Sequence, residues 1–582
     1  MRERTGIGRF RALWFVVGLV AVGVGMALTL RPFSSLDALR FFVAAGLILA
    51  GLGELAGNVE AGSLRLDRVT GGLLLATGLV AAVAPGLTVR GVAIVVGVGM
   101  LLSGGARLGG GWRGQVDERY AAIVGGLAGV VFGVLALAWP DVTILVVALF
   151  VGPVVVVFGA REMFLAVRGF RPKKPLSRRR SRIWLRGARA TGALLVALVL
   201  VLVSALVHQA SPTVPSFYSW SGSLPDKPGV LLRQEPTTTG MPAGSRAVRI
   251  LYTTTGLDGK ITPASGLVVV SATAPAGPRP VVLWEHGTTG VAQKCAPSIL
   301  KDPFTAGAMF VQGQVIARGW VLVAPDYLGL GASPPHPYLV GIPAARSALD
   351  AVRAARQLHW VKLSHQIVVW GHSQGGGAAL WTGIEAPSYA PDVPLSGVAA
   401  LAPAANLPAL AKALETGKVG MLLSSFMVAG YSNAYVDVAF NHYIRASART
   451  VVRAVVGRCL SEPATLLSLP AVLIGEQIFS RDLNAGPLGT RLAENVPDRV
   501  THTPTLIAQG DADSLVLPAV QSAFVHELCH AGQKLEYRTY PGLDHVPLVE
   551  PDSALIPYLL TWTQARFKHA NAPSNCSKLP AA

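Results

Sequence analysis

Hydrophobic residues form long runs in the first 210 positions of the chain and short runs after them. Runs near the roughly 20 residues that cross a bilayer occupy residues 12–30, 38–57, 70–85, 88–106, 120–139, 143–165 and 190–208. Beyond residue 223, short β-branched runs alternate with alanine-rich stretches, which is the order of an α/β sheet. We therefore predict seven membrane spans followed by an α/β domain.

The first six apolar runs form an internal repeat. A proline follows the first run of each pair, at Pro32, Pro85 and Pro140, with spacings of 53 and 55 residues. Each second run closes on small residues beside a charge, near 51–54, 103–107 and 157–162. This pattern predicts three tandem helical hairpins. It resembles the HdeD-like family of six-helix bacterial membrane proteins over about residues 10–168, and that resemblance implies an architecture without a mechanism.

Positive charge is concentrated in the membrane part. Residues 1–210 hold 23 Lys and Arg against 9 Asp and Glu, whereas the rest of the chain holds 27 against 23. The basic residues gather before the first span, near 65–68, near 107–119 and in the 166–190 loop, all on one side of a seven-span arrangement. The positive-inside rule then puts the N-terminus in the cytoplasm and everything after residue 210 outside. Without a groove-reading module, nucleic acid is not expected as a partner.

The most specific chemical motif lies at residues 371–375, which read Gly-His-Ser-Gln-Gly. The apolar strand expected at 366–370 precedes it, and a small-residue helix start follows it. Glycines on both sides let a tight strand-to-helix turn expose the serine hydroxyl. We therefore predict that Ser373 is a nucleophile in an α/β-hydrolase fold.

A serine nucleophile needs a histidine base and an acid, in that fold's chain order of serine, acid, histidine. The strand expected at 505–508 ends in a turn that holds Asp511 and Asp513, and we favour Asp513 with Asp511 as the alternative. The base is predicted at His545, in a loop after the strand at 535–540.

The tetrahedral intermediate needs two preorganised N–H donors. The residue after the nucleophile, Gln374, supplies one, and the glycine-containing loop His286 to Gly290 after the strand at 281–284 supplies the other. Thr288 is our choice and Thr289 the alternative, with His286 shaping the loop. No cofactor or metal is required.

From about residue 215 onward the chain resembles the secretory lipase family. The motifs that carry this resemblance are residues 286–288 with 295–298, residues 325–329, the turn at 371–375, and the acid and histidine turns. It implies Ser373, Asp513 and His545 as a catalytic triad. It also implies disulfides Cys295 to Cys459 and Cys529 to Cys576, whereas composition alone predicts two disulfides in any pairing, or free buried thiols.

One competing motif points to zinc. Residues 526–530 read His-Glu-Leu-Cys-His, two histidines one helical turn apart with a glutamate between them. We interpret it as accidental, because it falls on a helix surface after the acid turn and no third ligand follows at a suitable spacing.

The predicted organisation is a six-helix HdeD-like domain at 1–168, a basic cytoplasmic loop at 169–189, a seventh span at 190–210, and an α/β-hydrolase domain at 211–582. A helical cap or lid is expected at about 404–500. The predicted function is a membrane-anchored serine hydrolase of carboxylic esters, with lipid esters as substrate and a role in lipid catabolism. Alternatives are an acyltransferase or peptidase on the same fold, or a non-catalytic membrane binding protein. The sequence leaves the oligomeric state open.

Overall fold

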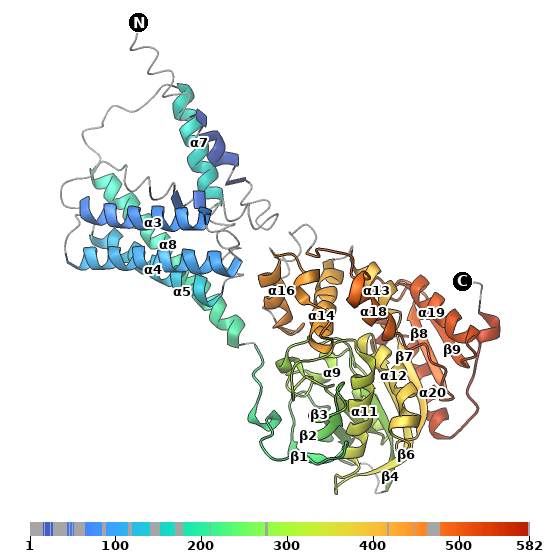
Figure 1. The fold of residues 1–582 in the computed structure, drawn as a ribbon. Coiled ribbons are helices and arrows are strands. Elements are labelled where there is room, and N and C mark those ends of the chain that lie inside the picture. The colour runs from blue at the N-terminus through green and yellow to red at the C-terminus, as the bar shows by residue number, and fades with distance from the viewer. Residues whose placement is uncertain are drawn as a thin grey trace. The chain divides into compact units, whose positions relative to one another are not determined.

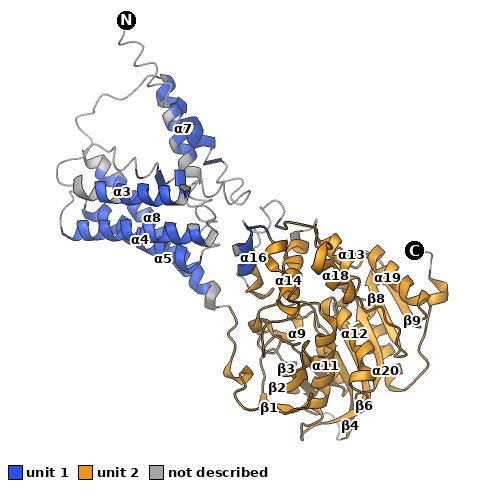
Figure 2. Cartoon of the chain, viewed as in Figure 1, with its two compact units in different colours: residues 1–210, 445–454, 466–478 blue, residues 211–444, 455–465, 479–582 orange. Residues whose placement is uncertain are grey.

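The computed structural model describes residues 64–83, 89–113, 119–139, 152–168, 179–209, 211–273, 277–415, 418–446, 448–462 and 478–579, with isolated helical positions between 15 and 51. The chain forms two compact units (Figure 2). The N-terminal unit comprises residues 1–210 with the short segments 445–454 and 466–478. The C-terminal unit comprises residues 211–444, 455–465 and 479–582.

The N-terminal unit is helical. Its helices are α3 Leu64–Val83, α4 Val89–Trp112, α5 Arg119–Ala138, α7 Gly152–Arg168 and α8 Arg179–Gln209 (Figure 1). Among the described residues, three segments are long and apolar enough to cross a membrane, at 93–112, 119–138 and 186–206. These match three of the seven expected spans. The expected runs at 12–30 and 38–57 lie largely outside the described residues, as does the first part of 143–165.

Helix α8 begins earlier than the seventh predicted span. It is continuous from Arg179, so the second half of the expected basic loop is helical. The reason is local, because the arginine-, leucine- and alanine-containing segment after residue 179 has high helix propensity. Residues 169–178 of that expected loop lie outside the described residues.

Glycine lets the helices of neighbouring repeats approach closely. A Cβ on Gly104 of α4 would lie 2.7 Å from the carbonyl oxygen of Gly126 on α5, and a Cβ on Gly126 would lie 2.8 Å from that of Gly104. Repeat-equivalent glycines make the same contact in two other pairs, Gly51 with Gly71 and Gly159 with Gly18. In each pair a second helix of one repeat meets a first helix of another, so these contacts join the three repeats in a closed order.

The glycine contact between α4 and α5 gives a matched pair of substitutions. Gly104→Leu should lower the melting temperature of the full chain in detergent, because the new side chain meets the backbone of α5. Gly105→Leu is the control, since nothing lies within 4 Å of a Cβ at Gly105. Equal melting temperatures for the two variants would show that this contact does not hold the helices together.

The C-terminal unit is built on a nine-stranded sheet of order β1-β2-β3-β5-β4-β6-β7-β8-β9. The strands are β1 Leu231–Pro236, β2 Ser245–Thr255, β3 Ile261–Ser271, β4 Pro278–Glu285, β5 Val321–Pro325, β6 Lys362–His372, β7 Leu395–Leu401, β8 Thr505–Gly510 and β9 Leu535–Tyr540. At one edge of the sheet, β1 pairs with β2, β2 with β3 and β3 with β5, all antiparallel. The remaining neighbours, in the order β5-β4-β6-β7-β8-β9, pair parallel. The strands expected from the sequence at 281–284, 366–370, 505–508 and 535–540 are present as β4, β6, β8 and β9.

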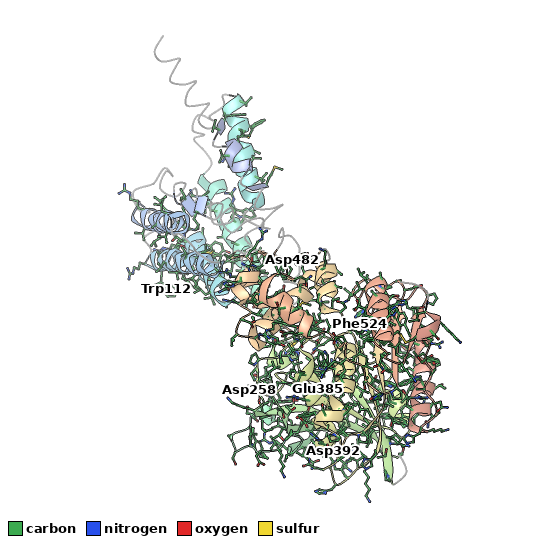
Figure 3. All side chains as sticks on the ribbon, turned by 45° about the vertical axis from the view of Figure 1, so that its right-hand side comes forward. Trp112, Asp258, Glu385, Asp392, Asp482 and Phe524 are labelled. Carbon is green, nitrogen blue, oxygen red and sulfur yellow. A yellow bond between two sulfur atoms is a disulfide. The ribbon has the colours of Figure 1, made fainter. Side chains whose placement is uncertain are left out.

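Helices cover both faces of this sheet (Figure 1). One face packs on α11 Gly341–Ala355, α12 Gln374–Tyr389 and α19 Pro518–His530, and the other on α10 Gln312–Ala317 and α20 Leu555–Phe567. Alternate residues of β4 pack into the hydrophobic layers on the two faces of the sheet, because successive side chains of a strand point to opposite faces. Val281 and Leu283 belong to the same hydrophobic layer as Phe524 of α19, which Figure 3 labels, whereas Val282 and Trp284 belong to the layer on the other face. The α/β-hydrolase expectation is therefore confirmed.

A helical insertion separates β7 from β8. It contains α13 Leu407–Leu414, α14 Lys418–Ala434, α15 Phe440–Tyr443, α16 Arg449–Val456 and α18 Gly486–Glu494. This is the segment in which the sequence predicts a cap. Residues 463–477 of the expected cap lie outside the described residues.

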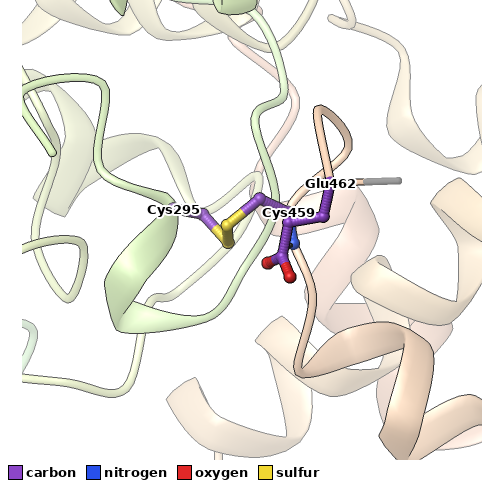
Figure 4. Close-up of side chains that lie close together, drawn as sticks. All are labelled: Cys295, Cys459 and Glu462. Carbon is purple, nitrogen blue, oxygen red and sulfur yellow. Dashed lines mark hydrogen bonds between the residues drawn. A yellow bond between two sulfur atoms is a disulfide. The ribbon is translucent and has the colours of Figure 1, made fainter. Parts of the chain in front are cut away.

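Two disulfides cross-link the C-terminal unit, in the pairing that the family resemblance implies. Cys295 is bonded to Cys459 across 164 residues, and Cys529 is bonded to Cys576 across 47. Glu462 lies beside the first disulfide (Figure 4), where it accepts a hydrogen bond from the Cys459 N–H at 2.8 Å and pairs with Lys294 at 2.7 Å. The sulfurs are covalently bonded and the carboxylate is already paired, so this cluster is a cross-link rather than a metal centre.

The long separation makes the first disulfide a strong constraint on the unfolded chain. Replacing Cys295 and Cys459 together by alanine should lower the free energy of unfolding by about 2–5 kcal/mol. Thermal melts of the full chain in detergent measure this loss, and reductant should lower the melting temperature of the wild type more than that of the variant. A double-alanine variant with the same melting temperature as the unreduced wild type would contradict the prediction.

Candidate active site

Ser373 lies at a tight turn between β6 and α12. Its backbone has φ 57° and ψ −118°, a conformation that is strained for a residue with a side chain. The flanking glycines make the turn possible, because a Cβ on Gly375 would overlap the carbonyl group of Glu285 at the end of β4. A Cβ on Gly371 would likewise overlap the carbonyl group of Gly375. The turn therefore sits directly against the neighbouring strand, with Ser373 partly exposed.

His545 and Asp513 form a buried hydrogen-bonded pair. The Nδ1 of His545 lies 2.8 Å from Oδ2 of Asp513, and both residues are at most 5% exposed. Since the carboxylate only accepts, Nδ1 carries the proton and Nε2 keeps its lone pair. Oδ1 of Asp513 accepts hydrogen bonds from the N–H groups of Leu515 and Val516, at 2.9 and 2.8 Å. The carboxylate is thus fully engaged and aimed at the imidazole.

The alternative acid, Asp511, lies elsewhere. It is exposed, and its Oδ1 accepts a hydrogen bond from the N–H of Gly542 at 2.6 Å. Of the two carboxylates in the turn after β8, the structure brings Asp513 to His545 and leaves Asp511 at the surface. Asp544 links the same two loops, because it accepts hydrogen bonds from the N–H groups of Ser514 and His545, at 2.8 and 2.7 Å.

Ser373 and His545 line one pocket. Its free space is about 350 Å³, open solvent at the mouth included. To its apolar wall the helical insertion contributes Leu410, Leu414, Leu423 and Met427 from α13 and α14. No hydrogen bond from the Ser373 hydroxyl to another described residue is present. In ligand-free serine enzymes this contact is often loose and tightens with substrate.

Two backbone N–H groups near Ser373 remain available for a ligand. Gln374 is the first residue of α12, so its N–H has no acceptor within the helix. Thr288 follows β4, and its N–H donates to no described residue. The hydroxyl of Thr288 is 2.8 Å from the hydroxyl of Tyr338, which lines the Ser373 pocket. The hydroxyl of Thr289 instead donates to the carbonyl of Cys295 at 2.8 Å, away from that pocket.

His286 has a structural environment, as expected. It is buried, it stacks on Tyr327 with ring centroids 4.3 Å apart, and its Nε2 is 3.2 Å from the carbonyl oxygen of Asp326. Burial lowers the pKa of His286 to about 4, so the ring is neutral at physiological pH.

His372 is a residue that sequence reasoning missed. Its Nε2 donates to the carbonyl oxygen of His545 at 3.0 Å, and the two rings lie 4.6 Å apart. Burial lowers the pKa of His372 to about 3, so it stays neutral. The turn motif leaves this position unspecified, and only the folded chain brings it to the base. Asp544 was missed for the same reason, although it is the neighbour of His545.

The residues of the zinc-like motif lie on α19. Glu527 and His530 are exposed, and Cys529 is bonded to Cys576. Among the described residues, the groups that could hold a metal do not include this helix. Cys529 of this motif is therefore committed to a cross-link.

Comparisons with known proteins agree with this geometry. The family model of the secretory lipases matches residues 303–575, and a model described as a short repeat of unknown function (DUF308) matches residues 69–127 and 124–207. Over 337 residues the chain is 23% identical to Lipase A of Moesziomyces aphidis, covering 54% of this chain and 71% of that protein. It is 26% identical over 307 residues to Lipase 5 of Candida albicans, covering 49% of this chain and 64% of that protein.

Among solved structures, lipase A of Candida antarctica is similar at a TM-score of 0.52 and 19% identity, covering 63% of this chain and 89% of that one. At this identity the likeness shows the fold. The family match includes Ser373, Asp513 and His545, the residues that the fold brings together. The C-terminal unit of this chain therefore matches the secretory lipase family, and its similarity to lipases supports a carboxylic ester hydrolase, whereas its N-terminal unit matches the short repeat of unknown function.

Proposed function

We propose that the protein cleaves carboxylic esters through an acyl-enzyme on Ser373, with His545 as general base and Asp513 as the acid that orients it. The observation that carries this proposal is the buried 2.8 Å hydrogen bond between His545 and Asp513, beside a serine held in a strained turn. A serine hydroxyl is a weak nucleophile until an oriented imidazole accepts its proton. The pair leaves Nε2 of His545 free for that role.

The proposed reaction has two halves. Nε2 of His545 takes the proton of Ser373 as Oγ bonds to the ester carbon, and the carbonyl oxygen becomes an oxyanion. The N–H groups of Gln374 and Thr288 stabilise that charge. His545 returns the proton to the departing alcohol as the carbon–oxygen bond breaks. Water, deprotonated by His545, then attacks the acyl group and releases the acid with Ser373 restored.

The lining of the pocket supports a lipid ester as substrate. Leucine and methionine side chains from α13 and α14 surround the space next to Ser373. Such a wall favours the transfer of an acyl chain out of water. Because these helices belong to the insertion between β7 and β8, we propose that the insertion acts as a cap that moves to admit the substrate.

The proposed location is the outer side of a membrane. Three apolar helices and the short repeat support membrane association of the N-terminal unit. The charge pattern of the sequence favours a cytoplasmic N-terminus, and two disulfides suit an oxidising compartment for the catalytic unit. The protein would then hydrolyse lipid esters at the surface to which it is anchored.

Labelling with a fluorophosphonate probe tests the nucleophile. The probe should label the full-length protein in detergent and fail to label Ser373→Ala, because phosphonylation requires an activated serine. Ser388→Ala is the matched control, since Ser388 lies on α12 and its hydroxyl bonds only the carbonyl of Glu385. Undiminished labelling of Ser373→Ala, or no labelling of a folded wild type, would refute the proposal.

The two carboxylates after β8 provide a second test. Asp513→Asn should lower kcat by about 10³–10⁴-fold, because the amide no longer holds His545 in the productive tautomer. Asp511→Asn should change kcat by less than about threefold, since a surface hydrogen bond contributes little. Hydrolysis of p-nitrophenyl esters measures both effects. If Asp511→Asn lowered kcat more than Asp513→Asn does, Asp511 would be the acid of the triad.

A further inference from the structure

The loop between β5 and α11, residues 326–340, touches both residues that present N–H groups to the proposed oxyanion. Tyr338 bonds the hydroxyl of Thr288 at 2.8 Å. His336, two residues earlier, bonds the side-chain amide of Gln374 at 3.3 Å. Thr288 follows β4 and Gln374 opens α12, so the two donors belong to different elements. The β5–α11 loop joins them from one side.

The direction of the His336 bond follows from its second nitrogen. Nδ1 of His336 lies 2.7 Å from the carbonyl oxygen of Leu328, so it carries the proton. Nε2 therefore accepts, and the Gln374 amide must donate to it. This leaves Oε1 of Gln374 buried without a partner among the described residues. The Gln374 side chain is thus held by His336 through one hydrogen bond.

Tyr338 has a similarly restricted position. It is 3% exposed, and its ring makes an edge contact with Phe426 of α14 at 6.1 Å between centroids. Burial raises the pKa of its hydroxyl to about 12, so the group is a neutral phenol that can donate to or accept from Thr288. The hydroxyl of Thr288 is consequently fixed from the side that lines the Ser373 pocket.

The β5–α11 loop is itself anchored at both ends. At its start, the carboxylate of Asp326 accepts hydrogen bonds from the backbone N–H of Ser298 at 2.9 Å and the hydroxyl of Ser265 at 2.6 Å. At its end, the carbonyl of Leu339 accepts a hydrogen bond from Tyr431 of α14 at 3.1 Å. A loop fixed at the sheet and at the helical insertion can hold other groups in place.

We infer that Tyr338 and His336 are positioning residues for the oxyanion hole, and that the β5–α11 loop acts as a brace for both of its donors. The inference rests on the proposed function. An oxyanion hole lowers the barrier only if its donors are oriented before the reaction starts. Thr288 lies in a loop, where no helix fixes its N–H, so the contact with Tyr338 matters most. Gln374 is the first residue of α12, so the helix already restricts its backbone N–H, and the hydrogen bond with His336 adds a smaller constraint.

A double-mutant cycle tests the contact between Tyr338 and Thr288. Tyr338→Phe removes only the hydroxyl, and Thr288→Val removes its partner with little change in volume. Each should lower kcat/KM for a p-nitrophenyl ester by about 3–10-fold, the loss of one hydrogen bond. The kcat/KM of the double variant should be no lower than that of the less active single variant, because both changes break the same hydrogen bond. If the fold losses in kcat/KM of the single variants multiply in the double variant, Tyr338 does not act through Thr288, and the proposed brace is refuted.

The affinity of an alkyl trifluoromethyl ketone provides a readout that a merely structural role would not move. Ser373 adds to the ketone carbon, its proton passes to His545, and the hemiketal oxygen becomes an anion in the oxyanion hole. The inhibition constant should rise in each single variant by the same factor as kcat/KM falls, with KM nearly unchanged. Retained ketone affinity in Tyr338→Phe and Thr288→Val would overturn the inference.

Tyr443→Phe is the control for losing a buried tyrosine hydroxyl. Tyr443 is 1% exposed, and its hydroxyl donates to the carbonyl of Ala485 at 2.8 Å. This variant should melt at a lower temperature with unchanged ketone affinity. A wild type that neither reacts with the fluorophosphonate nor binds the ketone would refute the proposed function and the brace together. A reactive wild type with unaffected variants would refute the brace alone.

Discussion

The tight turn at Ser373 is the constraint on which the rest of the catalytic unit depends. Ser373 holds a backbone conformation that residues with side chains avoid, and the turn survives because the sheet and α12 over-determine it. Gly375 must pack against the carbonyl of Glu285, which fixes the distance between the nucleophile and the loop after β4. A larger residue at position 375 would displace both.

Parallel strands gather the remaining groups at the same edge of the sheet. β4, β6 and β8 run in one direction, so the loops that follow them lie beside one another. Those loops hold Thr288, Ser373 and Asp513, and β9 leads to the loop that holds His545. The cross-links then come from outside the sheet. The first disulfide ties the segment after the Thr288 loop to the helical insertion, whose α13 and α14 complete the wall of the pocket.

The sequence predicted the parts of this arrangement that have local signals. The glycines around Ser373, the strand before it and the chain order of acid and histidine are visible in the residues themselves. Among the six parallel strands, β4, β6 and β8 were predictable for the same reason, because strands buried on both faces read as continuous apolar runs, whereas β7 was not predicted. The sequence favoured Asp513 but left Asp511 as an alternative, and only the folded turn shows which carboxylate reaches His545.

Other features depend on contacts between distant segments and left no local signal. The antiparallel strands β1 to β3 were not predicted, and neither were the contacts of His372, His336 and Tyr338, whose partners lie elsewhere in the chain. In the membrane unit, the small residues near 51–54, 103–107 and 157–162 were visible as part of the repeat. Which repeat each one contacts emerged only from the folded helices, as in the Gly104 and Gly126 pair.

The central claim is that an ester substrate acylates Ser373. Mass spectrometry of the full-length protein, quenched in acid during turnover of a p-nitrophenyl ester and digested, tests it most directly. The account predicts that the peptide containing Ser373 gains the mass of the acyl group and that the adduct is absent from Ser373→Ala. Turnover with an acyl adduct on a different residue, or hydrolysis by Ser373→Ala at the wild-type rate, would contradict it.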